Sequence, residues 1–257
     1  MAHSHLILDR EGGIRIITLN RPESMNAMNI QLLIEMESVL DEINGDEKAR
    51  VIILRGAGKN FCVGVDLKEM LAPSARQQVT DRVTPLFNKL ESFDLPTIAV
   101  INGHCNGGGL ELSLCCDFRI ASKDAYFGLG EVKLGMIPGG GGTARLPRLI
   151  GPGRARELLY FGTPFDSNEA HQISLVNKVV APEDLMTESR RWATALSESP
   201  PLSLKMLKRC INKGMQMDLA SSIAYEARCV EILKSTEDLI EGIAAFKEKR
   251  KPVFKGK

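Results

Sequence analysis

Short apolar runs alternate with longer amphipathic segments along roughly the first 150 residues of the chain. Runs rich in β-branched residues have the pattern of buried strands and cover residues 5–9, 14–19, 51–54, 98–101 and 118–121. The glycines between the first two runs predict a hairpin turn. Two further segments, residues 28–43 and 79–90, repeat apolar side chains at helical spacing. From residue 144 the period is mostly helical, apart from a short strand expected at residues 176–180. This order predicts an α/β fold with a helical C-terminal part.

The most informative stretch covers residues 98–117. A β-branched run is followed by three glycines, 107–109, and then by a segment that is apolar on nearly every side. This pattern predicts a buried helix that begins at the glycines. The N–H groups of a first helical turn have no partner inside the helix, and glycines leave room for a ligand oxygen to reach them.

Glu111 is the only charged residue between positions 98 and 116. A carboxylate among apolar side chains is costly unless it is paired or used. Glu111 follows Gly108 by one helical turn, and helical side chains lean toward the N-terminus of the helix. A carboxylate beside oxyanion-binding amides suits chemistry at a carbonyl group. The alternative is a structural Glu paired with an Arg or Lys; the neighbouring glycines favour the functional interpretation.

Composition excludes several classes of protein. The chain has 257 residues, of which 44% are hydrophobic, and a formal net charge of +1. This charge gives no electrostatic case for binding nucleic acid or an anionic membrane surface. No apolar run approaches the ~20 residues that a membrane-spanning helix requires, and the first residues lack the pattern of a secretory signal. The six cysteines form no C-x-x-C pair, which predicts free thiols, no metal site and a cytoplasmic location.

Two glycine-rich segments could suggest a phosphate-binding loop. Residues 139–143 lack the Lys-Ser/Thr ending of a Walker A motif, and residues 103–109 lack the G-x-G-x-x-G spacing of a dinucleotide-binding turn. A serine-hydrolase triad is also disfavoured, because the chain has no G-x-S-x-G sequence. These segments therefore predict no nucleotide site.

Segments at residues 60–70, 103–117, 127–142 and 246–251 together resemble the enoyl-CoA hydratase/isomerase (crotonase) family, in order and at the family's spacing. The resemblance implies a spiral of ββα units, with a core at residues 1–195. It also implies a helical C-terminal region at residues 196–257 that forms a homotrimer, or a homohexamer built from two trimers. Whether assembly stops at three or six subunits is left open.

The resemblance also implies an acyl-CoA thioester as the substrate. Its thioester oxygen would lie between the backbone N–H groups of Val65 and Gly108. Family members that hydrate enoyl thioesters carry two glutamates, which match Glu111 and Glu131 here. We assign water activation to Glu111 and protonation of the α-carbon to Glu131. No metal and no separate cofactor are expected, since coenzyme A is part of the substrate.

Other reactions remain as alternatives. An enoyl-CoA isomerase or a hydrolase would use the same oxyanion-binding groups. A non-catalytic scaffold that binds acyl-CoA or RNA is disfavoured by the two glutamates and the glycines, and RNA also by the near-neutral charge.

The rest of the CoA would contact residues that the resemblance assigns to its path: Val63, Val65, Asp66, Leu67, Lys68, Gly108, Phe246 and Lys249. The alternative for the last two is a solvated basic tail. The chain departs from the family's usual small residues at Val63, Val65 and Asn106, and Gly130 replaces a usual proline. These departures leave the acyl group open between linear, branched and cyclic; a cyclic or branched group is one hypothesis consistent with the altered pocket.

Overall fold

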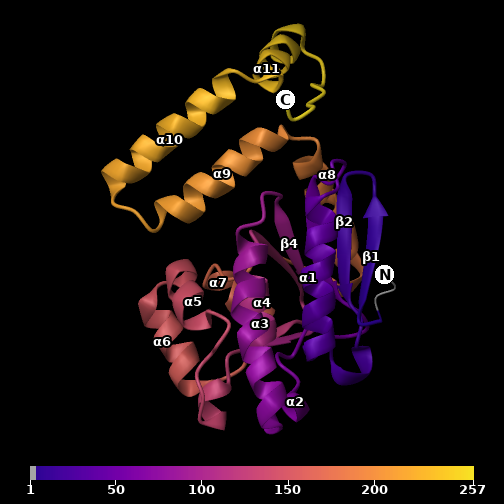
Figure 1. The fold of residues 1–257 in the computed structure, drawn as a ribbon, viewed down its shortest axis with the longest axis vertical. Coiled ribbons are helices and arrows are strands. Elements are labelled where there is room, and N and C mark those ends of the chain that lie inside the picture. Colours follow the sequence, from indigo (N-terminus) through magenta and orange to yellow (C-terminus); the bar gives the residue numbers. More distant parts are fainter. Residues whose placement is uncertain (1–3) are drawn as a thin grey trace.

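Two β-sheets of unequal size form the body of the structure, a computed structural model that describes residues 4–257. The large sheet has the order β1-β2-β3-β4-β6-β9 and the small sheet the order β5-β7-β8 (Figure 1). The strands of the large sheet are β1 (Leu6–Glu11), β2 (Ile14–Leu19), β3 (Val51–Gly56), β4 (Thr97–Ile101), β6 (Phe118–Ser122) and β9 (Lys178–Val180). Those of the small sheet are β5 (His104–Asn106), β7 (Tyr126–Gly128) and β8 (Phe165–Asp166).

The predicted hairpin is confirmed, because β1 pairs with β2 in antiparallel fashion. The other neighbours in the large sheet are parallel. Parallel strands are covered on both faces and therefore have continuous apolar runs. Alternate side chains accordingly enter two different cores: Ile17 points to one with α1 and α3, and Ile16 to the other with α8.

Successive units of the chain contribute one strand to each sheet. β4 is followed by β5, and β6 is followed by β7, and the second strands pair in parallel as the first ones do. A bridge between Cys62 and Cys105 continues the small sheet into the preceding unit, and a bridge between Met28 and Val65 continues it once more. The predicted spiral of ββα units is therefore confirmed.

The helices cover the sheets and form most of the second half of the chain. They are α1 (Ile30–Asn44), α2 (Leu67–Leu71), α3 (Pro73–Glu91), α4 (Gly108–Leu114), α5 (Gly142–Ile150), α6 (Pro152–Phe161), α7 (Ser167–Gln172), α8 (Leu185–Ser197), α9 (Pro201–Gly214), α10 (Leu219–Lys234) and α11 (Glu237–Glu248).

Two of these helices differ from the sequence-based expectation. Helix α3 begins at Pro73, earlier than the predicted residue 79, and α2 was not predicted. The first turns of α3 contribute no buried side chain before Val79, so they carry no apolar period. Proline at the first helical position and the Asp66 cap of α2 are the local signals that start these helices.

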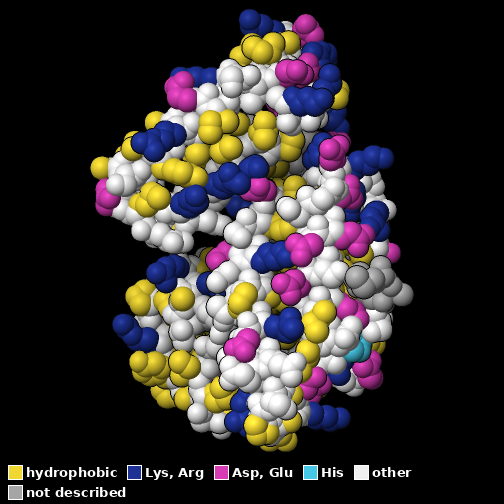
Figure 2. Space-filling view, in the orientation of Figure 1, with side chains coloured by type: hydrophobic (Ala, Val, Ile, Leu, Met, Phe, Trp, Pro, Cys, Tyr) yellow, Lys and Arg dark blue, Asp and Glu magenta, His cyan; other side chains and the backbone are white. Residues whose placement is uncertain are grey.

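The last three helices extend away from the sheets (Figure 1). Figure 2 shows hydrophobic side chains gathered over α9 and α10, above a notch that separates them from α5 and α6. A cavity of about 950 Å³ lies there, lined by α9, α5 and the ends of α3 and α4.

The division of the chain at residue 195 stays a prediction. Within residues 4–257, no helix combines the length and the apolar character that crossing a bilayer requires.

Candidate active site

The start of α4 is built by glycines that other side chains could not replace. Gly107 precedes the helix with a φ of 53°, a conformation that favours glycine. A Cβ atom on Gly109 would lie 2.1 Å from the carbonyl oxygen of Cys62. The helix therefore packs against the preceding ββα unit with its first turn as close as backbone allows. This contact fixes the direction in which the first N–H groups of α4 point.

Val65 lies beside this helix start. A Cβ atom on Gly108 would be 3.6 Å from Cγ2 of Val65, and one on Gly64 would be 3.1 Å from the backbone nitrogen of Gly108. The backbone around Val65 is held by a hydrogen bond from the N–H of Met28 to Gly64. Among residues 4–257, neither the N–H of Val65 nor that of Gly108 has a hydrogen-bond partner. The structure thus brings together the two predicted oxyanion donors.

Glu111 is buried one turn into α4, with 3% of its surface exposed. Its Oε1 atom accepts hydrogen bonds from the N–H groups of Gly140 (2.8 Å) and Gly142 (2.7 Å). The alternative that an Arg or Lys pairs with Glu111 is wrong within the described residues, where Arg145 instead pairs with Glu91. Main-chain amides therefore hold the carboxylate through Oε1, and Oε2 forms no hydrogen bond within residues 4–257.

Glu131 approaches the same helix start from the other side. It opens the short 3-10 helix η2 (Glu131–Leu134), and its Oε1 atom would lie 3.2 Å from a Cβ on Gly107. Its Oε2 atom is buried and has no hydrogen-bond partner among residues 4–257. A buried carboxyl oxygen without a partner is costly and is a feature of functional sites.

Both carboxyl groups resist ionisation, because the pKa of each is raised above its ordinary value. Burial raises the pKa of Glu111 to about 6; the amide of Gly142 opposes this rise, and the nearby charge of Glu131 adds to it. Burial also raises the pKa of Glu131, against a hydrogen bond from its own backbone N–H. The charge of one carboxyl group raises the pKa of the other, so the two groups resist being ionised together, which suits a pair in which one accepts a proton and the other donates one.

The predicted CoA-binding residues fall into two separate groups. Val63 and Val65 are half-buried next to α4, whereas Leu67 and Lys68 are exposed on α2. The Asp66 carboxylate caps α2 through the N–H of Lys68 and pairs with Arg21 at 3.1 Å, so its own side chain is already engaged.

The second group lies on the C-terminal helix α11. Phe246 is 86% exposed, and Lys249 ends the helix with a left-handed backbone. Figure 1 shows α11 and α2 at opposite ends of the molecule, so a single chain does not bring the two groups together.

Sequence reasoning missed the segment that holds Glu111. The sequence assigns no contact with Glu111 to residues 139–142, yet Gly140 and Gly142 supply the amides that Glu111 accepts from. Arg145, which follows the glycines, was also missed. The signal that could have found them is a glycine run in a chain whose buried carboxylate needs donors, since exposed main-chain amides are what such a run offers.

Comparison with known proteins agrees with this geometry. Residues 9–257 match the family described as Enoyl-CoA hydratase/isomerase. The chain is 40% identical over 257 residues to a crotonyl-CoA hydratase of Syntrophomonas wolfei, covering 99% of both chains. It is 40% identical over 254 residues to a short-chain-enoyl-CoA hydratase of Clostridium acetobutylicum, covering 98% of this chain and 97% of the other. The crystal structure of an enoyl-CoA hydratase from Bacillus anthracis is similar with a TM-score of 0.97 at 39% identity, covering 99% of this chain and all of that one (100%).

Proposed function

Because this chain belongs to the enoyl-CoA hydratase/isomerase family, we propose that it is an enoyl-CoA hydratase that adds water across the 2,3 double bond of an enoyl-CoA thioester. The observation that carries the proposal is the pair of glutamates with raised pKa values, Glu111 and Glu131, on either side of a glycine-rich helix start. Retention of both carboxyl groups favours hydration over the single-carboxylate chemistry of an isomerase.

The reaction follows from these positions. Water attacks the β-carbon, and ionised Glu111 takes one proton from it. The electrons of the double bond move onto the thioester oxygen, where the N–H groups of Val65 and Gly108 stabilise the enolate. Protonated Glu131 then gives its proton to the α-carbon, and the thioester carbonyl reforms. One donor of this kind contributes typically ~10²–10³ in rate. Glu111 ends protonated and Glu131 ionised, so exchange with solvent restores the starting state.

The names of two relatives, a crotonyl-CoA hydratase and a short-chain-enoyl-CoA hydratase, support a short linear acyl group. The test is incubation with crotonyl-CoA while the absorbance of the conjugated thioester is followed and 3-hydroxybutyryl-CoA is identified by mass. Rapid loss of absorbance with formation of that product supports hydration. Release of free CoA would favour a hydrolase, and a shifted double bond an isomerase.

A homotrimer or homohexamer is part of this proposal. Large apolar side chains are exposed on the C-terminal helices, at Leu207, Ile211, Met215, Leu219, Ile223, Val230, Ile232, Ile240 and Phe246. Burying them between subunits would remove this apolar surface from water. Light scattering should give three or six times the chain mass of 28.2 kDa. The cytoplasmic location stays a prediction, supported by cysteines that are free in the structure.

A further inference from the structure

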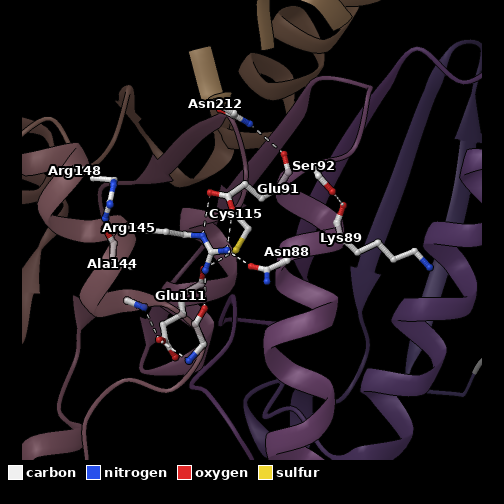
Figure 3. Close-up of polar contacts among 12 residues, drawn as sticks. Asn88, Lys89, Glu91, Ser92, Glu111, Cys115, Ala144, Arg145, Arg148 and Asn212 are labelled. Atoms are coloured by element: carbon white, nitrogen blue, oxygen red, sulfur yellow. Dashed lines mark hydrogen bonds and ion pairs between the residues drawn. The ribbon is translucent and has the colours of Figure 1, made fainter. Parts of the chain in front are cut away.

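Arg145 joins the loop that holds Glu111 to helix α3 (Figure 3). Its Nη1 atom donates to the carbonyl oxygen of Gly140 at 2.7 Å. Its Nε and Nη2 atoms donate to the two carboxylate oxygens of Glu91 at 3.0 and 2.8 Å. The side chain thus uses a planar fork on Glu91 and a further N–H on the loop, which is a geometry that only a guanidinium provides.

Helix α3 contacts the same loop at further points. Asn88 accepts a hydrogen bond from Nη2 of Arg145 at 2.7 Å, and Thr84 donates to the carbonyl oxygen of Gly139 at 3.1 Å. A Cβ atom on Gly140 would lie 2.7 Å from the ring of Phe87. One face of α3 therefore contacts the loop at several points, and Arg145 forms the charged contact between α3 and the loop.

The loop passes between Arg145 and Glu111 with no spare room. The N–H of Gly140 donates a hydrogen bond to Glu111, and the carbonyl oxygen of Gly140 accepts one from Arg145. Gly141, which has a φ of 99°, would place a Cβ atom 2.1 Å from Nη1 of Arg145. A displacement of the guanidinium would therefore move the peptide groups that hold the Glu111 carboxylate.

We propose that Arg145 is a positioning residue for Glu111, and that Glu91 and Asn88 hold it in the required orientation. Arg145 makes no contact with the reacting atoms in this proposal. It fixes the loop whose amides orient the carboxylate that activates water. The inference rests on the proposed hydratase function, because it deepens the role of the same site.

Charge acts in the same direction as geometry. The groups that face Glu111 are Glu131 from η2, Arg145 from α5, and the thiol of Cys115, which directly follows α4, with Glu91 of α3 behind Arg145. The positive charge of Arg145 lowers the pKa of Glu111, as do the amides of Gly140 and Gly142. Losing the guanidinium would remove the first effect and loosen the loop that gives the second. The pKa of Glu111 should then rise above its value of about 6.

Two variants separate geometry from charge. Arg145→Lys keeps the charge but cannot reach Glu91, Asn88 and the loop together, and Glu91→Gln keeps Arg145 but removes its ionic anchor. Arg190→Gln is the matched control, because Arg190 makes the same two-pronged contact with Glu11, at 2.8 Å for each bond, on exposed side chains of α8 and β1. We expect kcat for crotonyl-CoA hydration to fall roughly 10- to 100-fold in the first two, with KM nearly unchanged. The acidic limb of the Arg145→Lys pH profile should move to higher pH.

A second readout does not depend on activity. The Glu111 carboxyl carbon can be titrated by ¹³C NMR in the ligand-free protein and assigned by its loss in Glu111→Gln. Its pKa should rise in Arg145→Lys and stay unchanged in Arg190→Gln; Glu91→Gln is judged by kcat, because losing the negative charge of Glu91 opposes the effect of a loosened loop on this pKa. A protein that hydrates no enoyl-CoA would refute the proposed function, and this titration would still test the inference.

The proposal is overturned if both variants keep the wild-type kcat, or if Arg145→Lys keeps the wild-type Glu111 pKa. It is also overturned if they only lower the melting temperature, as Arg190→Gln would. Should Arg145→Lys and Glu91→Gln fail to fold, Asn88→Ala removes one acceptor and leaves the ion pair in place. A wild-type Glu111 titration in that variant would overturn the proposed role of Asn88 in orienting Arg145.

Discussion

Gly142 donates its backbone N–H to Oε1 of Glu111 at 2.7 Å, across 31 residues of sequence. The amide of Gly140 donates to the same oxygen at 2.8 Å. One carboxylate oxygen thus accepts from two main-chain N–H groups. Substituting neighbouring side chains would not delete these donors. Any acceptor oxygen at position 111 can keep the loop in place, so charge and structure can be separated at this residue.

Glu111→Gln should therefore fold normally and lose activity. The amide oxygen of Gln can accept from Gly140 and Gly142, but the neutral side chain cannot take a proton from water. Removing a general base typically costs about 10²–10⁴ in rate. Turnover of crotonyl-CoA, followed by the absorbance of the conjugated thioester, should fall by this factor with KM little changed. Near-wild-type turnover would remove Glu111 from the mechanism.

The same substitution should stabilise the protein at neutral pH. The folded pKa of Glu111, about 6, lies above the ordinary 4.5, so the folded state binds the proton more tightly. Stability then falls as pH rises through this window, by ~2 kcal/mol for a shift of this size, and the whole penalty is present above pH 6. Urea unfolding at pH 7 should show Glu111→Gln to be more stable than the wild type, and the difference should vanish near pH 4.

Glu35→Gln provides the control of opposite sign. Burial alone would raise the pKa of Glu35, but hydrogen bonds from Gln31 and from the N–H groups of His5 and Ser4 outweigh it and lower the pKa to about 2. The stability that this gives is complete above the ordinary pKa of 4.5 and is lost as pH falls toward 2. Glu35→Gln should therefore destabilise the protein at pH 7. Equal effects of both substitutions would contradict the assigned environments.

Glu131→Gln should block proton delivery to the α-carbon. Its Oε2 atom is buried without a partner among residues 4–257, and burial raises the pKa of this carboxyl group, which favours its neutral, proton-donating form. In ²H₂O the wild type should place deuterium at the α-carbon of the product. The reverse reaction should then slowly exchange this position with solvent. The variant should lose this exchange together with ~10²–10⁴ in rate. Full exchange at the α-carbon without Glu131 would assign the proton to another group.

How far the sequence leads depends on what each position requires. The strands follow from continuous apolar runs such as residues 98–101, because parallel strands are buried on both faces. Glu111 stands out in its sequence because a lone charge in an apolar helix needs an explanation. Glu131 does not, since its burial comes from the fold around Gly107 rather than from its neighbours in sequence; only the family resemblance points to it.

Other parts of the site depend on contacts that no local pattern encodes. Gly140 and Arg145 are linked to Glu111 and to α3 across long stretches of chain. The polar first turns of α3 show no apolar period, so its start at Pro73 is visible only in the structure. Long-range hydrogen bonds and exposed helical turns are thus the features that the sequence alone does not predict.

Backbone donors predict an unusual pattern of tolerance at the oxyanion-binding groups. Val65→Ala should keep kcat within a few-fold, because the N–H that acts belongs to the main chain. Gly109→Ala should fail to fold or be strongly destabilised, since its Cβ would lie 2.1 Å from the carbonyl oxygen of Cys62. Circular dichroism and the crotonyl-CoA assay on both proteins would check this. A large loss of kcat in folded Val65→Ala would show that the side chain takes part.

Phe246 and Lys249 are assigned to the end of the substrate that lies farthest from the reacting thioester. If Phe246 and Lys249 hold the adenosine phosphate of CoA, each alanine substitution should raise KM for crotonyl-CoA. For Lys249→Ala a rise of about tenfold corresponds to ~1.4 kcal/mol, a reasonable value for one charge-assisted contact. Crotonyl-pantetheine lacks the adenosine phosphate, so its KM should not change. Lys255→Ala is the control, because Lys255 lies in the same basic segment but is not assigned to CoA.

The same comparison tests the assembly. Within one chain, α11 lies at the far end of the molecule from α2 (Figure 1), so an effect of Lys249 on KM requires a second subunit that brings α11 to the site. Diluting the enzyme to a concentration at which light scattering shows single chains should then raise KM for crotonyl-CoA. The KM for crotonyl-pantetheine should stay unchanged. A solvated tail predicts no change with either substrate in any variant, and that result would remove Phe246 and Lys249 from the CoA site.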